Sequence, residues 1–475
     1  MDKPFIHFIT IGDNRYLFDV NTNMIIKITL EIYEYLNNHG SDVTYVNELS
    51  SEGKKILLDL KEQGLLKDSK PKIIYHPMTD LVEDMLKSNL SRMTLQVTQN
   101  CNLRCQYCVY SGSYNNRVHN NKRMDIETAK KAIDFLKNHS QSAEDIIISF
   151  YGGEPLLEMK LIQECVTYSK KVFEGKKASF NLTTNAVLLS EENIEYLSKE
   201  DFILTISLDG PKEVHDKNRK FVNSDSGTYD IVMRNLEKIL DIAPDYIAKV
   251  TFNAVLDDES SFEDTNDFFM KHDIVKNMIV SANSINAVNR KEQLKAFSVK
   301  NYVDRNYESF IGMLYSLGRV DKDCVSHLIK KEISDIKEKI SDRSIVDSTI
   351  PMKSHPGGPC VPGFQRPFVN AYGKLFPCER VSETAEYMCI GNLDDGFDMN
   401  RIKEMLNIGR LTEDNCRNCW AYNFCTQCVA TADDGICLSK ENRLEKCNAV
   451  RNYVENMIKD YIVLKENGCQ FTNLV

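Results

Sequence analysis

Three cysteines on one short loop are the most distinctive chemical feature of the sequence. Cys101, Cys105 and Cys108 have the spacing C-x3-C-x2-C and directly follow an alternating apolar run at 93–98. Three thiolates on one tight loop can bind three irons of a 4Fe-4S cluster and leave the fourth iron open to a ligand, as a reactive cluster requires. A closed tetrahedral zinc site needs a fourth ligand at matched spacing, and the next cysteine along the chain is Cys165. The spacing therefore favours a cluster with one open iron.

A second group of cysteines lies in the C-terminal part of the chain. Cys360 and Cys378 flank a stretch that predicts a hairpin turning near Gly373, which would bring both thiols to one end. A C-x2-C-x5-C-x2-C knuckle and two further cysteines follow, at Cys416, Cys419, Cys425, Cys428, Cys437 and Cys447. Two C-x2-C pairs could form one zinc ribbon, but the block has more thiols than one tetrahedral ion binds. Two metal centres are therefore favoured, in a block that should fold only with its metal.

The composition excludes several classes of protein. A chain of 475 residues predicts two to four domains, and a net charge of -10 argues against nucleic acid as a partner. The N-terminus lacks a signal-peptide pattern, and no apolar run is long enough to cross a membrane. We therefore expect a soluble, cytoplasmic protein without a membrane partner. In that reducing compartment, the 15 cysteines indicate metal or redox ligands and not disulfides.

The elements that must position the first loop are alternating strands and helices. Strands are expected at 93–98, 146–150, 178–183, 202–208, 247–255 and 277–282, with helices at 125–138, 158–173, 190–198, 228–241 and 260–271. Six β-α units predict an α/β fold with a parallel sheet and right-handed crossovers, a partial (β/α)6 TIM-like barrel. Active residues should then lie just after the strand ends.

Polar and glycine-rich motifs do follow the predicted strands. The second strand runs into Gly152-Gly153-Glu154, the third into Asn185, and the fourth into the segment 207–211. A Gly-Gly-Glu sequence lets backbone approach a ligand's amino and carboxylate groups, and its glutamate can pair with an ammonium. The same sequence also makes an ordinary turn, and on its own it does not decide between the two.

Three further regions flank the barrel, which is expected at 79–283. Residues 1–78 predict a small antiparallel meander and two helices, a winged-helix-like domain whose exposed strand edge could accept an extended peptide. A packing appendage without a ligand is an equal alternative. Residues 284–350 predict a helical connector, either covering the barrel mouth or serving as a spacer. Residues 351–460 form the cysteine-rich domain.

Taken together, these motifs resemble a known superfamily. The cysteine loop after a first barrel strand, with YGGEP, TTNA and SLDGP at later strand ends, resembles the radical S-adenosylmethionine (SAM) enzymes. The block from Cys360 to Cys447 resembles the SPASM extension of that superfamily, except that the last knuckle spacing is x2, ending at Cys428. Residues 1–78 are similar to a domain that captures leader peptides. The whole resembles peptide maturases that form thioethers, the sactipeptide, ranthipeptide and freyrasin group.

The resemblance implies cofactors, partners and site residues. It implies S-adenosylmethionine, three 4Fe-4S clusters, an external one-electron donor such as flavodoxin or ferredoxin, and a precursor peptide whose leader binds the N-terminal domain. Cys101, Cys105 and Cys108 would bind the cluster whose open iron takes the amino and carboxylate groups of S-adenosylmethionine. The cofactor-binding residues would be Tyr107 near the adenine, Glu154 with Gly152 and Gly153 at the ammonium, Ser207 and Arg219 at the ribose and carboxylate, and Asn185 shaping the pocket.

Two auxiliary clusters are implied in the C-terminal domain. Cys416, Cys419, Cys425 and Cys447 match a fully ligated cluster, although Cys437 could replace Cys447. Cys360, Cys378 and Cys428 match the other cluster, for which relatives that do not bind a peptide thiol add a fourth cysteine shortly after the first. Residues 364–366 contain no cysteine here, so an open iron could bind a substrate thiolate. Cys389 could instead close the cluster, although its apolar neighbours favour a packed thiol.

One candidate catalytic residue follows from the same resemblance. Glu379, next to Cys378, matches the position where sulfatase-maturing relatives place an acidic base, and a plain surface carboxylate is an equal alternative. The sequence therefore predicts a thioether-forming peptide maturase. The alternatives are an anaerobic sulfatase-maturing, formylglycine-forming enzyme, another radical peptide modification such as carbon-carbon crosslinking, or a zinc-ribbon binding protein of a different class.

Overall fold

The computed structural model describes residues 3–257, 259–292, 298–345 and 348–471, so parts of the predicted connector, 293–297 and 346–347, lie outside the described residues. The barrel has six parallel strands that pair in chain order: β5 (Arg92–Thr98), β6 (Asp145–Gly152), β7 (Lys177–Thr184), β8 (Ile203–Ser207), β9 (Val250–Leu256) and β10 (Val280–Ser284). The predicted partial barrel is therefore confirmed.

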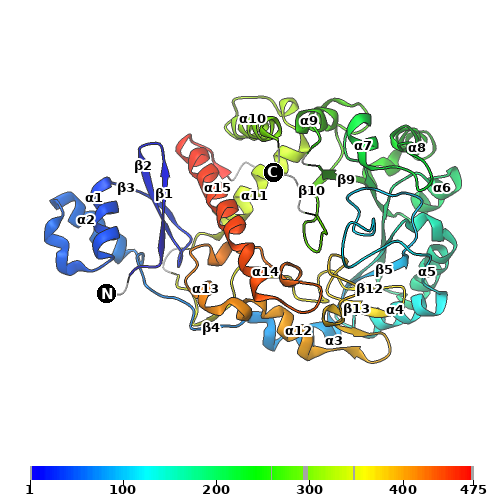
Figure 1. The fold of residues 1–475 in the computed structure, drawn as a ribbon, viewed down its shortest axis with the longest axis horizontal. Helices are drawn as coiled ribbons and strands as arrows, with labels where there is room; N and C mark the ends of the chain where they lie inside the picture. Colours follow the sequence, from blue (N-terminus) through cyan, green and yellow to red (C-terminus); the bar gives the residue numbers. More distant parts are fainter. Residues whose placement is uncertain (1–2, 258, 293–297, 346–347, 472–475) are drawn as a thin grey trace.

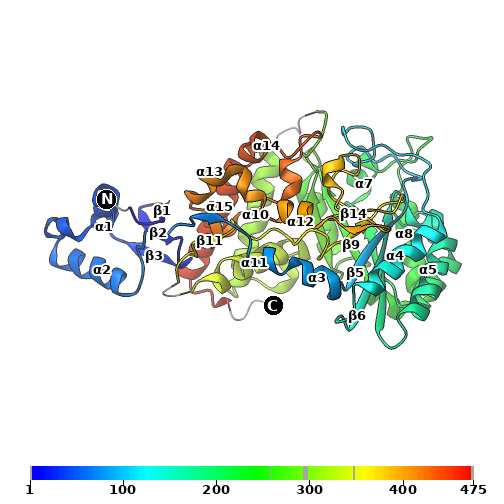
Figure 2. The same cartoon turned by 90° about the horizontal axis from the view of Figure 1, so that it is seen from below.

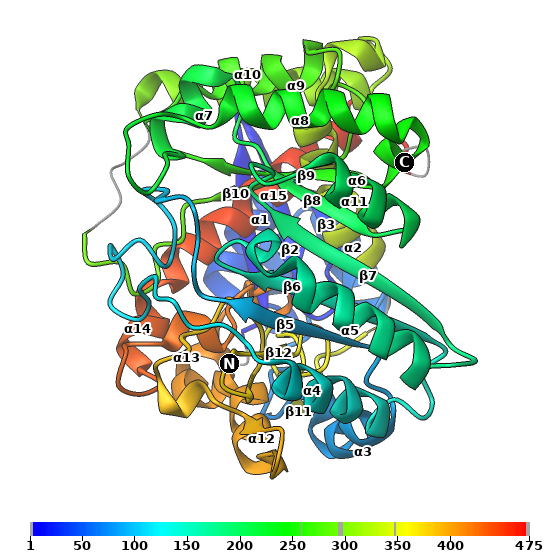
Figure 3. The same cartoon turned by 90° about the vertical axis from the view of Figure 1, so that its right-hand side faces the viewer.

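Amphipathic helices cover the outer face of this sheet, as Figures 1 and 3 show. They are α4 (Ile126–Asn138), α5 (Met159–Val172), α6 (Glu191–Lys199), α8 (Tyr229–Ile242) and α9 (Phe262–Lys271). Their buried faces pack on the apolar strand residues in one core. Two details of the prediction were wrong. The expected strand start at 247–249 belongs to a 3-10 helix (Pro244–Lys249), and a short helix α7 (Lys212–Asn218) was missed because two turns carry too little periodicity.

The C-terminal domain extends the barrel sheet, which the sequence did not indicate. Strand β12 (Phe368–Val369) pairs in parallel with β5, placing Phe368 opposite Thr94. It also forms the predicted hairpin with β13 (Lys374–Phe376), beyond which lie β14 (Gly391–Asn392) and β15 (Gly396–Phe397). The result is one ten-stranded sheet in which the hairpin after Cys360 lies beside the strand that leads to Cys101.

The N-terminal domain lies at one end of the elongated molecule (Figures 1 and 2). It contains the predicted meander, β1 (Ile6–Ile11), β2 (Asn14–Asp19) and β3 (Ile25–Ile28), with α1 (Leu30–His39) and α2 (Ser51–Glu62) packed on its own small core. The other face of the meander packs on the C-terminal domain, where the His7 ring stacks on Trp420 with ring centroids 3.8 Å apart. This domain and the C-terminal domain therefore share a core.

The remaining elements link these parts. Strand β4 (Ile73–Ile74) pairs with β11 (Lys353–Ser354), and the other helices are α3 (Val82–Ser88), α10 (Val299–Ser316), α11 (His327–Lys339), α12 (Met399–Leu406), α13 (Glu413–Arg417), α14 (Lys440–Glu445) and α15 (Cys447–Glu466). Helix α11 packs against α15. Across the described ranges, no helix combines the length and apolar character needed to cross a membrane.

Candidate functional site

The loop after β5 holds the first three cysteines close to backbone N–H donors. The Leu103 N–H donates to the Cys101 Sγ at 3.4 Å, and the Tyr110 N–H donates to the Cys108 Sγ at 3.4 Å. Burial raises the pKa of the Cys101 and Cys105 thiols to about 12, so these thiols ionise only beside a positive charge. A metal deprotonates a coordinated thiol outright, and the N–H donors then stabilise the thiolate. This donor set fits an iron-sulfur cluster.

Two glycines let the end of β6 pack directly under this loop. A Cβ added at Gly152 would lie 2.0 Å from the Thr98 carbonyl oxygen, and one at Gly153 would lie 2.1 Å from the Asn100 carbonyl oxygen. The Gly153 N–H donates to the Thr98 carbonyl at 2.9 Å. The close approach that the sequence predicted for these glycines is therefore an approach to the cysteine loop itself.

Glu154 joins the ends of β6 and β7 beside the first cysteine. Its buried carboxylate accepts hydrogen bonds from the Thr184 hydroxyl at 2.6 Å and from the Asn185 and Leu156 N–H groups at 2.8 and 3.0 Å. Burial raises the pKa of Glu154, and these three donors are all neutral. An ammonium group would supply the missing positive charge. The Asn185 Nδ2 lies 3.8 Å from the Cys101 Sγ, so the structure brings the predicted residues Glu154 and Asn185 to the cluster loop.

Asp209 is a residue of this site that the sequence interpretation missed. Its carboxylate accepts from Arg219 through Nε at 2.8 Å and Nη2 at 3.0 Å, and from the Tyr107 hydroxyl. The Arg219 guanidinium also lies over the Tyr107 ring, 5.4 Å from its centroid. The guanidinium fork predicted to bind a ligand is thus occupied by Asp209, while Ser207 stands half-buried at the end of β8. The SLDGP motif was a signal for Asp209, since it follows the strand end directly.

A buried polar network connects the cluster loop to the C-terminal domain. Glu383 accepts from the Tyr110 hydroxyl at 2.6 Å and from the Gln96 Nε2 at 2.8 Å, and its Oε1 lies 3.3 Å from the Arg117 Nε. Arg117 also donates to the Glu379 carbonyl at 3.0 Å. Nothing in the sequence pairs these residues, because the contacts join segments more than 260 residues apart.

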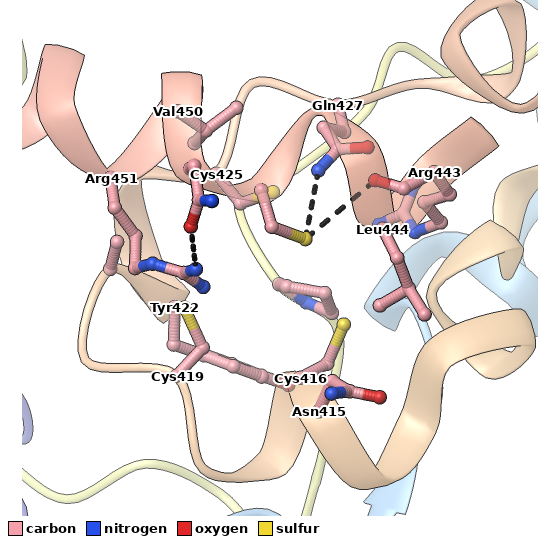
Figure 4. Close-up of a pocket in the computed structure, with 14 residues that line it drawn as sticks. Asn415, Cys416, Cys419, Tyr422, Cys425, Gln427, Arg443, Leu444, Val450 and Arg451 are labelled. Atoms are coloured by element: carbon pink, nitrogen blue, oxygen red, sulfur yellow. Dashed lines mark hydrogen bonds between the residues drawn. The ribbon is translucent and has the colours of Figure 1, made fainter. Parts of the chain in front are cut away.

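Four C-terminal cysteines surround one cavity of about 290 Å³. Its lining includes Cys416, Cys419, Cys425 and Cys447, the four predicted ligands of a fully ligated cluster. Figure 4 shows labelled thiols around the cavity, with Arg443 and Arg451 on two sides. Cys437 does not line it, and its exposed thiol donates to the Asp434 carboxylate at 3.4 Å. Within the described residues, no group of three or more His, Cys, Asp or Glu side chains is placed to hold a single metal ion.

The remaining predicted ligands lie apart from this cavity. Burial, and then the charges of Glu379 and Cys428, raise the pKa of Cys378 to about 11, so Cys428 lies near enough to act on the Cys378 thiol. The Cys360 side chain is exposed. Cys389 donates to the Gly391 carbonyl at 3.1 Å.

Glu379 is almost fully buried beside Cys378, which excludes the surface-carboxylate interpretation. Its Oε1 accepts a hydrogen bond from the Arg366 guanidinium and lies 3.8 Å from the Arg380 Nε. Arg366 lies in the region where, by the resemblance, relatives that do not bind a peptide thiol would have a fourth cysteine. The catalytic role of Glu379 stays a prediction.

The comparisons with known proteins agree with the fold that carries these residues. Residues 95–269 match the Radical SAM superfamily. The cysteine-type anaerobic sulfatase-maturating enzyme of Clostridium novyi is 24% identical over 71% of this chain and 87% of its own length. The solved structure of native anSMEcpe with bound AdoMet has a TM-score of 0.57 at 19% identity, covering 79% of this chain and 99% of that one, which supports the fold.

A shorter match has the higher identity. The uncharacterized protein MJ0907 of Methanocaldococcus jannaschii is 39% identical over 30% of this chain, and the match spans 46% of that protein's length. The family match covers five of the six barrel strands, β5 to β9, and includes the loop that carries all three cysteines. Residues 95–269, just over a third of the chain, are therefore similar to the radical SAM superfamily, and the three-cysteine loop and the buried Glu154 fit an iron-sulfur cluster and S-adenosylmethionine as cofactors.

Proposed function

We propose that this chain is a radical SAM peptide maturase that forms thioether bonds between cysteine sulfur and carbon in a ribosomally made precursor peptide. The observation that carries the proposal is the incomplete cysteine set at Cys360, Cys378 and Cys428. Three protein thiolates leave one position of an auxiliary cluster for a thiolate from the substrate. A substrate cysteine held there would be deprotonated and placed for bond formation.

The position of Cys389 supports the open site. Its thiol donates to the Gly391 carbonyl, and it lines a separate pocket with Lys374, Glu386 and Arg401 that includes none of the three cysteines. Arg366, one of the three residues in the region where a fourth cysteine would fall, forms an ion pair with Glu379. These contacts support an open site over closure of the set by Cys389.

The chain's own residues would hold and orient the reactants. When bound, the first cluster and S-adenosylmethionine would supply a 5′-deoxyadenosyl radical able to take a hydrogen atom from a substrate carbon, and the auxiliary cluster would accept the electron released when the cysteine sulfur bonds to that carbon. Glu154 would hold the methionine ammonium, and Tyr107, fixed by Asp209, would border the adenine. Glu379, buried beside Cys378, would accept the proton released by the substrate. The edge strands of the N-terminal sheet would pair with an extended leader peptide.

The test is mass spectrometry of a precursor peptide encoded beside this chain and co-expressed with it. Each thioether removes one C–H and one S–H hydrogen, so the peptide should lose two hydrogens and one alkylatable thiol per crosslink. Cys378→Ser should abolish this change, whereas the matched control Cys389→Ser should retain it. A modified peptide that keeps all its thiols would overturn the proposal, and a chain with stoichiometric zinc and no iron would support the zinc-ribbon alternative.

Sulfatase maturation is a second candidate, favoured by the Clostridium novyi relative. That chemistry converts a cysteine or serine to formylglycine, so a cysteine substrate loses its sulfur and gains an aldehyde. A thioether retains the sulfur, and the two products therefore differ in mass and in their reaction with carbonyl reagents. An aldehyde in the product, with Cys389→Ser inactive, would decide for the second candidate.

A further inference from the structure

Arg443 is the largest fully buried side chain in the described part of the protein, and its charge has no partner there. Only 1% of the residue is exposed. The Nε donates to the Thr412 hydroxyl at 3.1 Å, but both terminal nitrogens, Nη1 and Nη2, lack a hydrogen-bond acceptor. A buried cation without a counter-ion is strongly destabilising, because its lost hydration is not replaced by an opposite charge. Such a group requires an anion, and the described residues do not provide one.

The guanidinium lines the cavity of the four cysteines. Arg443 borders it together with Cys416, Cys419, Cys425 and Cys447 (Figure 4). Its anchor is part of the same site, since the Thr412 hydroxyl lies 3.2 Å from the Cys416 Sγ. The backbone of Arg443 contacts another ligand candidate, because its carbonyl accepts from the Cys447 thiol at 3.6 Å. Both ends of the residue are therefore fixed to the cysteine site.

A 4Fe-4S cluster bound by four thiolates has a net negative charge, and reduction adds one more negative unit. Net charge, hydrogen bonds to sulfur and solvent exposure set the reduction potential of such clusters. A buried cation with two free donors changes two of these quantities in the same direction. Because it favours the more negative state, it raises the potential.

We propose that Arg443 is a positioning residue that directs its two unpartnered guanidinium NH2 groups at the sulfur atoms of this auxiliary cluster, and so raises the cluster's reduction potential. The proposal rests on the auxiliary cluster of the proposed function, which is tested first and separately. Anaerobically reconstituted full-length protein should contain about twelve irons per chain for three clusters. Its reductive titration should show a wave that is absent in Cys419→Ser, and that wave belongs to this site.

The measurement is the midpoint of that wave in Arg443 variants. Arg443→Gln removes the charge, so the ratio of reduced to oxidised cluster at a fixed potential should fall about tenfold, or about 59 mV for one electron. Arg443→Lys keeps the charge but loses the paired donors, so it should show a smaller fall. The matched control is Arg417→Gln in the neighbouring helix α13. Arg417 forms an ion pair with Glu413 and does not line the cavity.

Each outcome decides the question. A loss of about four irons per chain in Arg443→Gln, with the other waves intact and Arg443→Lys still loaded, supports charge compensation. If Arg443→Gln does not fold, Arg443→Lys alone decides, and an unchanged midpoint there overturns the proposal. Full iron content with a ratio unchanged within about threefold in both variants also overturns it. A wild-type chain without the wave that depends on Cys419 would instead remove the auxiliary cluster, and the role of Arg443 with it.

Discussion

The buried pair of Asp209 and Arg219 gives a direct test of how the barrel positions its cluster loop. Asp209 is 1% exposed, and its carboxylate accepts four hydrogen bonds. Two come from Arg219 at 2.8 and 3.0 Å, one from the Val255 N–H at 2.9 Å, and one from the Tyr107 hydroxyl. Asp209→Asn keeps the shape of the side chain but removes its charge and turns an amide NH2 toward a donor.

The magnitude follows from the burial of the pair. Removing one member of a buried ion pair costs about 3–5 kcal/mol, because the other charge stays buried without compensation. The matched control is Asp201→Asn in the same barrel, whose carboxylate lies 3.1 Å from the Lys249 Nζ with both side chains exposed, 71% and 45%. Such surface pairs contribute about 0–1 kcal/mol. At about 2–4 °C per kcal/mol for a domain of this size, Asp209→Asn should lower the barrel's melting temperature by at least about 6 °C.

The assay is thermal unfolding of anaerobically reconstituted protein, followed by helical circular dichroism, with iron content measured on each sample. Tyr107→Phe removes one hydrogen bond to the carboxylate, so it should cost about 1 kcal/mol. A decrease below about 2 °C in Asp209→Asn, or an equal decrease in Asp201→Asn, would refute the reasoning. Such a result would mean that the pairing of Arg219 with Asp209 does not stabilise the barrel, and would leave the predicted contact with the cofactor carboxylate as the role of Arg219.

Three further predictions concern titratable or aromatic groups that are buried or half-buried. Burial lowers the pKa of His215 to about 3, so between pH 6.5 and 3 the unfolded chain binds a proton that the folded chain excludes. The free energy of unfolding should therefore decrease as the pH is lowered, by about 1.4 kcal/mol at pH 5.5. This acid-dependent loss should vanish in His215→Gln. Burial, and then the Glu332 charge, raises the pKa of Asp460 to about 6. The folded protein favours the neutral acid, so this contribution to stability is lost as the pH rises through that value. Asp460→Asn should therefore raise the free energy of unfolding by up to about 3 kcal/mol at pH 7.5 and not at pH 4. Because His7 stacks on Trp420, the only tryptophan, His7→Ala should shift tryptophan emission to longer wavelength, and an unchanged spectrum would contradict the stack.

The strands and their polar ends were predictable because they depend on local sequence. Apolar runs of five to nine residues predicted β5 to β10, and motifs such as Gly152-Gly153 lie where parallel strands end. The pairing of β12 with β5 was not predictable, because a two-residue strand has no periodicity to detect. Arg443 lies in a charged run, ENRLEKC, that is typical of a solvated helix, and only the packing of α14 shows that it is buried.

The shared sheet gives the two proposed reaction centres a fixed relation. Strand β5 leads into the loop with Cys101, and its neighbour β12 belongs to the hairpin between Cys360 and Cys378. The buried network around Glu383 then ties that hairpin's far end to the same loop. In the proposed reaction, a radical formed on one side and a thiolate held on the other would have to meet at one substrate, and misplacement by about 1 Å can cost two orders of magnitude in rate. Continuous strand pairing provides that precision, because neither site can move without breaking hydrogen bonds of the sheet. Glu383→Gln should therefore uncouple crosslinking from S-adenosylmethionine cleavage, and equal loss of both activities would contradict this coupling.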